Sequence, residues 1–238
     1  SCLYKILLIM KKLLLFIIAL SSLGLTAQTM AFSAVEVRMK EHTEKDVLEA
    51  FDKVMEGVEP NKGGVVLERI WYNSPAKGMS HRMVWLYTLG EDLFDDESID
   101  EDKNEAFWAK MGNYVEDWGT SYSGRMLSWK EGDTEKYPRV HIWDIKITDR
   151  NRFKKAHDQI VKEFSAEFKD RLVAFGTYDI GKPNGASHWV ALTGKDQADH
   201  MLLYDKLEKS SKFLKLISER GPVENVKDFQ AQILRRIQ

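Results

Sequence analysis

The sequence has 238 residues and a formal net charge of −2, and 30% of its residues are charged. A mildly acidic chain is a poor partner for nucleic acid, whose binding requires clustered positive charge. Cys2 is the only cysteine, so the rest of the chain has no disulfide and no thiolate that could ligate a metal.

Residues 1–27 have the pattern of a secretory signal peptide preceded by a short extension. Met10 is followed by two lysines, an apolar run over residues 13–20 and small residues that end at Ala27. The apolar run is too short for a comfortable membrane span. Removal of this segment leaves 238 − 27 = 211 residues and changes the net charge from −2 to −5, because it carries three lysines and no acid. We expect an exported bacterial protein, periplasmic or extracellular, without membrane attachment after cleavage.

The first half of the remaining chain, residues 32–130, predicts the element order β-α-β-β-α-β. Alternation of apolar and polar residues indicates strands, and apolar residues at helical spacing indicate helices. Thr43 is expected to begin the first helix, with Asp46 as its capping-box partner. The strands are expected over residues 32–40, 64–72, 81–89 and 125–129, and the second helix over residues 105–118.

The second half, residues 138–237, repeats this order after a short linker over residues 131–137. Thr148 is expected to cap the first helix of this half, and a second helix is expected from Asp196 with Met201 on its apolar side. A short extra helix is expected over residues 211–219. The strands are expected over residues 140–147, 172–178, 188–192 and 226–233.

A repeated motif connects the two halves. Tyr72 precedes His81 by nine residues, and the segment Gly78-Met79-Ser80-His81 ends this interval. Tyr178 precedes His188 by ten residues, and the segment Gly185-Ala186-Ser187-His188 ends that one. Self-similarity of this kind indicates two copies of one small domain, and so short a linker indicates that the copies pack together.

A β-α-β-β-α-β unit is ferredoxin-like, with helices on one face of an antiparallel sheet. The bare face of each sheet must be covered, and the other copy is the obvious cover. The tandem arrangement over residues 32–237 resembles the dimeric α+β barrel superfamily, which includes the antibiotic-biosynthesis-monooxygenase-like domains, here as a single-chain pseudo-dimer. The resemblance implies an α+β fold with a central barrel and helices outside. Relatives of this fold include cofactor-free oxygenases, haem-handling enzymes and isomerases, and a pseudo-dimer that pairs its own sheets is consistent with a monomer.

The first strand of each half carries an acid and a base on one face. Glu36 and Arg38 alternate with apolar residues, as do Asp144 and Lys146. In one interpretation these charges face the interior, must be paired there, and make Glu36 and Asp144 candidate bases. In the other they form an ion pair on a partly wet sheet surface. We expect the second, because structural ion pairs outnumber catalytic ones.

The histidines of the repeated motif, His81 and His188, are the other candidate catalytic residues. A histidine at the start of a strand could act as a general base or bind a metal or haem. Alternatively, the serine and histidine stabilise the hairpin by bonding to backbone groups. We expect the structural role and no metal site, because isolated histidines without a partner at close spacing rarely form one.

Aromatic residues suggest where a ligand would bind. Tyr72, Tyr178, Trp143 and Trp189 are the candidates for lining a cavity, although aromatic residues also simply fill cores. The sequence therefore favours a protein that binds a small apolar or aromatic molecule in or beside the barrel, with cofactor-independent oxygenase-like activity as one outcome. It requires no cofactor, and haem is the one that the resemblance admits. The alternative is a non-enzymatic structural or interaction protein with a filled barrel, and the sequence leaves open whether the protein is an enzyme.

Overall fold

The computed structural model describes residues 28–72, 77–94 and 100–238, and these contain eight strands that form one closed barrel. The order around the barrel is β1-β3-β2-β8-β5-β7-β6-β4, and antiparallel pairing of β4 with β1 closes it. Each half of the chain contributes four neighbouring strands, and the halves join where β2 meets β8 and where β4 meets β6. The expected signal peptide, residues 1–27, lies outside the described residues.

The first half of the barrel is built from residues 30–130. Its strands are β1 (Met30–Met39), β2 (Gly63–Tyr72), β3 (His81–Thr88) and β4 (Val115–Lys130). Its helices are α2 (Glu44–Val54) and α3 (Glu101–Tyr114). Within this half the strands lie in the order β4-β1-β3-β2.

The second half repeats that order as β8-β5-β7-β6. Its strands are β5 (Arg139–Ile147), β6 (Val173–Thr177), β7 (His188–Gly194) and β8 (Val223–Ile237). Its α-helices are α4 (Arg150–Glu163), α5 (Gln197–Glu208) and α6 (Ser211–Glu219), and a short 3₁₀ turn, η1 (Pro183–Gly185), precedes β7.

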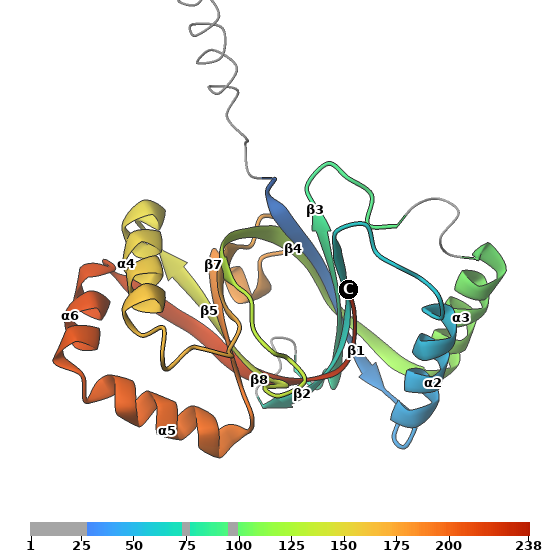
Figure 1. The fold of residues 1–238 in the computed structure, drawn as a ribbon. Helices are drawn as coiled ribbons and strands as arrows, with labels where there is room; N and C mark the ends of the chain where they lie inside the picture. The colour runs from blue at the N-terminus through green and yellow to red at the C-terminus, as the bar shows by residue number, and fades with distance from the viewer. Residues whose placement is uncertain (1–27, 73–76, 95–99) are drawn as a thin grey trace, which may run out of the picture.

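The helices cover two opposite sides of the barrel. Figure 1 shows α2 and α3 on one side and α4, α5 and α6 on the other. Because side chains alternate along a strand, each strand sends one set of residues into the barrel and the other toward its helices. On β1, for example, Phe32 and Ala34 belong to the core inside the barrel, whereas Val37 packs with Phe51 of α2 in an outer core. Among the described residues, no helix is both long and apolar enough to cross a membrane.

The boundary between the second helix and the last strand of the first half was predicted wrongly. The helix is α3, which ends at Tyr114, and Val115 and Trp118 belong to β4 instead of the expected helix over residues 105–118. The spacing of Met111, Tyr114, Val115 and Trp118 suits a helix, but β4 pairs with β1 along this stretch, with Trp118 opposite Val37. Pairing with a long partner strand outweighs local helical spacing, because β propensity depends on context.

One predicted capping box, one predicted helix cap and one helix face were also wrong. Thr43 is the N-cap residue of α2, as expected, but its hydroxyl donates to the Lys40 carbonyl oxygen and accepts no bond from the helix, so the expected capping box is not formed. Asp149, not Thr148, caps α4 by accepting a bond from the Arg152 amide. Met201 is 60% exposed, because α5 buries Leu203 and Leu207 on its inner side.

Candidate functional site

Glu36 and Asp144 lie inside the barrel, which contradicts the expectation of a partly wet sheet surface. Both residues are 0% exposed. The bases on the same strands do not pair with them, since Arg38 contacts Asp117 and Lys146 contacts Glu224 in exposed positions. The closed barrel is the physical reason for the difference, because its inner strand faces have no access to water.

The first half surrounds its buried charges with partners. Arg82, which lies opposite both Glu36 on β1 and Glu68 on β2, forms an ion pair with Glu68 at 2.7 Å. Arg82 Nη1 also donates to the Tyr122 hydroxyl at 3.2 Å, and that hydroxyl donates to Glu36 Oε1 at 3.2 Å. Burial alone would lower the pKa of Arg82, but the Glu68 carboxylate raises it well above its usual value, so the guanidinium stays charged.

The second half leaves its buried carboxylate less well bonded. The Tyr178 hydroxyl donates to Asp144 Oδ1 at 2.6 Å, whereas Asp144 Oδ2 has no hydrogen-bond partner among the residues that the structure describes. Burial raises the pKa of Asp144 to about 6, and the bond from Tyr178 opposes this rise only in part. Burial also raises the pKa of Tyr178 well above its usual value, so the phenol remains a donor.

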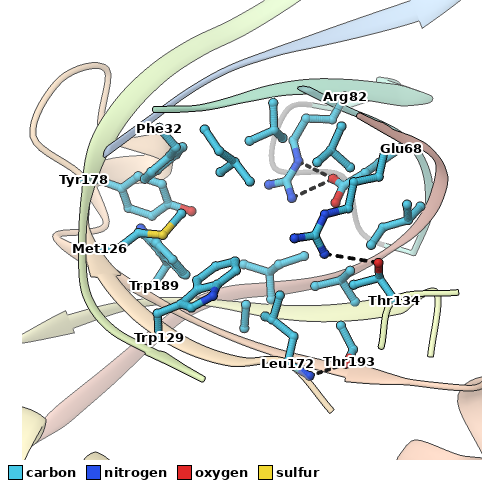
Figure 2. Close-up of a pocket in the computed structure, with 18 residues that line it drawn as sticks. Phe32, Glu68, Arg82, Met126, Trp129, Thr134, Leu172, Tyr178, Trp189 and Thr193 are labelled. Carbon is cyan, nitrogen blue, oxygen red and sulfur yellow. Dashed lines mark hydrogen bonds and ion pairs between the residues drawn. The ribbon is translucent and has the colours of Figure 1, made fainter. Parts of the chain in front are cut away.

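A cavity of about 100 Å³ lies inside the barrel beside these networks. Figure 2 shows Phe32, Tyr178, Met126 and two tryptophans along one side and the Arg82–Glu68 ion pair on the other. The two tryptophans are Trp129 and Trp189. The wall is mostly apolar with a few polar groups, which is the usual character of a small-molecule site.

The four aromatic candidates occupy different places. Tyr178 and Trp189 line the inner cavity. Tyr72 is 48% exposed, and its hydroxyl bonds to Gln197 on the surface. Trp143 lies on the outer face of β5, where it packs on His141 and lines a second cavity.

Tyr72 and Tyr178 are not equivalent positions. Arg69 of β2 pairs with His81 of β3, and Thr177 of β6 pairs with His188 of β7. The residue equivalent to Tyr178 is therefore Ile70, whose amide donates to the Ser80 carbonyl just as the Tyr178 amide donates to that of Ser187. The similar intervals in the sequence hide a shift of two residues.

His81 and His188 do not converge, because each lies on the outer face of its own half. In both motifs the serine hydroxyl bonds to Nδ1 of the histidine, at 2.9 Å for His81 and 2.8 Å for His188. His81 Nε2 contacts Glu44 of α2 at 2.9 Å. His188 stacks on Phe175, and its Nε2 is buried without a partner within the described part of the chain. Burial lowers the pKa of His188 to about 4, so it is neutral near pH 7.

A second apolar cavity, larger than the one inside the barrel, lies between the second half and its helices. It has a volume of about 380 Å³. Strands β5, β6 and β7 form one wall, and α4, α5 and α6 form the other. Residues that define it include Trp143, Ile160, Val190, Tyr204, Phe213 and Ile217.

His157 is the polar group that distinguishes this cavity. The side chain is buried, and its Nε2 has no hydrogen-bond partner among the described residues. Its Nδ1 lies 3.3 Å from the Asp158 carboxylate. Burial would raise the pKa of Asp158, but bonds from His157, Lys154 and Ser128 lower it well below its usual value, so the carboxylate accepts the Nδ1 proton. In the neutral form of the ring, this hydrogen bond places the proton on Nδ1 and the lone pair on Nε2.

The first half of the chain shows that this position does not need a polar residue. His157 lies seven residues after the first residue of α4, and Phe51 lies seven residues after the first residue of α2. Phe51 is 0% exposed in the outer core of the first half. An unpartnered nitrogen in a buried site costs about 1–3 kcal/mol, so a histidine at this position is not explained by packing. His157 is not among the site residues predicted from the sequence, although it lies four residues after Phe153 on the apolar side of its helix.

The described residues contain a candidate ligand for haem iron but no cluster of side chains for a metal ion. The described residues contain no group of three or more His, Cys, Asp or Glu side chains that could hold a metal ion. His157 could hold the iron of a haem, because its Nε2 is an unbonded imidazole nitrogen and the residue lines an apolar cavity. Arg220, which also lines the cavity, is the basic residue available for an acidic substituent of such a group.

Comparison with known proteins agrees with the fold. No family model matches the sequence, and no curated protein sequence matches it significantly. Among solved structures, a candidate monooxygenase from Lactobacillus acidophilus NCFM is similar with a TM-score of 0.62 and 14% identity, over 89% of this chain and 97% of that one. A candidate monooxygenase from Fusobacterium nucleatum has a TM-score of 0.52 and 14% identity, over 90% and 96% of the two chains. An anthrone oxidase-like protein has a TM-score of 0.51 and 7% identity, over 89% and 93%.

The barrel, its flanking helices and these full-length similarities define the class. The chain has an α+β barrel fold, as the sequence predicts, and shares this fold with the candidate monooxygenases. Both halves of the barrel come from one chain.

Proposed function

We propose that the protein binds a small, flat, mostly apolar molecule in the cavity beside β5, β6 and β7, with His157 as its polar contact. The observation that carries this proposal is the unbonded, buried Nε2 of His157, a residue that lines an apolar cavity of about 380 Å³. A lone pair in such a cavity accepts a hydrogen bond, so the favoured ligand carries a hydroxyl group on an aromatic body. Trp143 and Tyr204 lie on the wall where the aromatic body would pack.

We propose further that this site supports oxygenase-like chemistry without a cofactor. His157 Nε2 would take the proton of the phenolic hydroxyl as a general base, and Asp158 would stabilise the imidazolium through Nδ1. The resulting phenolate is electron-rich and is the species that molecular oxygen would oxidise. The candidate monooxygenases of the same fold support this chemistry by analogy alone.

We also propose that the chain is a tandem repeat and that it is exported. The strand orders β4-β1-β3-β2 and β8-β5-β7-β6 support two tandem ferredoxin-like repeats, residues 32–130 and 138–237. The sequence pattern over residues 1–27 supports export, so the ligand would be met in the periplasm or outside the cell.

Binding of 1-naphthol, followed by quenching of tryptophan fluorescence, tests the site. We expect saturable binding that His157→Phe weakens at least tenfold, whereas naphthalene, which lacks the hydroxyl, is affected far less. His188→Phe is the matched control, because His188 also has a buried free Nε2 but does not line this cavity. Equal binding of 1-naphthol to all three proteins would reject the site, and the absence of any binding would favour a non-enzymatic structural protein.

Haem binding is the second candidate, and the same free nitrogen favours it. When bound, haem supplies redox chemistry at its iron, and His157 would hold it from α4. An absorbance spectrum of the protein after incubation with haem separates the two candidates. A Soret band that His157→Phe shifts and His188→Phe leaves unchanged would favour haem.

A further inference from the structure

The cavity inside the barrel contains two arginines in an otherwise apolar wall. Arg82 and Arg236 both line it, together with one carboxylate, that of Glu68. Glu68 is already engaged, since it pairs with Arg82 at 2.7 Å. Arg236 is paired as well, with Glu131, so an anion would be favoured only by a guanidinium N–H that these carboxylates leave without an acceptor.

Arg236 reaches the cavity from β8. It lies opposite Val66, an inward-facing residue of β2, whereas its neighbour Arg235 points outward and pairs with Asp52 of α2. Arg236 Nη1 donates to the Thr134 hydroxyl at 3.1 Å, which is the bond drawn at Thr134 in Figure 2. Its Nη2 donates to the exposed Glu131 at 3.0 Å.

The third nitrogen of this guanidinium, Arg236 Nε, is buried and makes no hydrogen bond within the described residues. A buried N–H of a charged group that lacks an acceptor is more costly than a neutral one. An acceptor in the cavity would satisfy it, and a carboxylate would do so with the strength of a charge-assisted bond.

We infer that the barrel interior binds a short aliphatic carboxylate, with its carboxylate at Arg236 Nε and its hydrocarbon part against Phe32, Val84 and Ile142. The volume sets the size, because an apolar cavity of about 150 Å³ accepts benzene and this cavity is smaller, at about 100 Å³. An acid of about four carbons matches that space. This site is separate from the proposed cavity beside the barrel, because the two share no lining residue.

Butyrate is the probe, and ligand-observed NMR on the whole protein is the measurement. We expect butyrate to bind at least tenfold more tightly than 1-butanol or butylamine. Arg236→Gln should weaken butyrate binding at least tenfold. Arg235→Gln is the matched control and should leave it unchanged, because that arginine is on the outside of the barrel.

A second variant protects the test against loss of folding. Ala191→Leu adds volume to the cavity wall and keeps Arg236, so it should also abolish butyrate binding while circular dichroism confirms the fold. His157→Phe should not affect butyrate, which separates this inference from the proposed function. Equal binding of 1-butanol and butyrate, equal binding to Arg236→Gln and the wild type, or no binding of butyrate to the wild type would overturn it.

Discussion

The two halves of the barrel place different residues at equivalent positions. Where the first half has the ion pair of Arg82 and Glu68, the second has Trp189 opposite Gly176. A Cβ on Gly176 would lie 2.4 Å from the Trp189 ring, so the glycine makes room for the tryptophan. At this pair of positions an ion pair therefore fills the barrel interior in the first half, and an aromatic ring fills it in the second.

The helix-facing side shows the same contrast. Glu44, the first residue of α2, bonds to both Arg69 and His81. In the second half these three positions are Arg150, Thr177 and His188. His188 is left with a free nitrogen, and so is His157 where the first half has Phe51. At these positions the first half has a bonded histidine and a phenylalanine, whereas the second half has two histidines with an unbonded nitrogen, of which His157 lines the cavity beside the barrel.

The largest expected effect is the loss of the charged pair in the first half. Arg82→Met leaves Glu68 buried without its partner and should lower the free energy of unfolding by about 3–5 kcal/mol. Urea denaturation at pH 7 measures it. The double variant Arg82→Met with Glu68→Leu should recover most of the loss, and a double variant as unstable as the single one would contradict a charge-based explanation.

The buried carboxylate of the second half should respond to pH. Because the pKa of Asp144 is raised from 3.8 to about 6 in the folded protein, its contribution to stability is fully present below about pH 4 and is lost as the pH rises through 6. Asp144→Asn removes this dependence and should be more stable than the wild type by roughly 3 kcal/mol above pH 7, with the difference vanishing near pH 4. Urea denaturation between pH 4 and 8 measures it, and a difference independent of pH would contradict the assignment.

Substitutions at the equivalent helix positions Phe51 and His157 should change the stability of the protein in opposite directions. Phe51→His places an unpartnered polar ring in the first outer core and should destabilise the protein by about 2 kcal/mol. His157→Phe removes a free buried nitrogen and should be neutral or stabilising by about 1 kcal/mol. Thermal denaturation of both variants checks this. If His157→Phe were as destabilising as Phe51→His, His157 would be a packing residue.

The smallest expected change in stability comes from substituting the first residues of α2 and α4. Glu44→Gln weakens the contacts to Arg69 and His81 and should cost about 1 kcal/mol at pH 7. Its bonds to Arg69 lower the pKa of Glu44, so this cost should disappear as the pH falls through that lowered pKa. Arg150→Gln should change little, and equal effects of the two variants in urea denaturation would show that the halves do not differ here.

The element order was predictable because most strands and helices keep a clear periodicity. The boundary at Val115 was not, since the apolar residues around it satisfy helical spacing and only pairing with β1 selects a strand. The burial of Glu36 and Asp144 depends on closure of the barrel, which cannot be predicted from a local sequence pattern. His157 could have been found by aligning α4 with α2, which sets a histidine against Phe51, but its free nitrogen depends on contacts far apart in the sequence.

Strand β8 is the last strand in the chain, yet it lies between β2 of the first half and β5 of the second. Until residues 223–237 are in place, the edges of β2 and β5 have no partner, and exposed strand edges promote aggregation. Folding must also bring together residues as distant as Val65 and Ile237, which makes barrel closure slow by the usual relation between sequence separation and rate. Because this strand also supplies Arg236 to the cavity, we expect the inner cavity to form only when β8 closes the barrel.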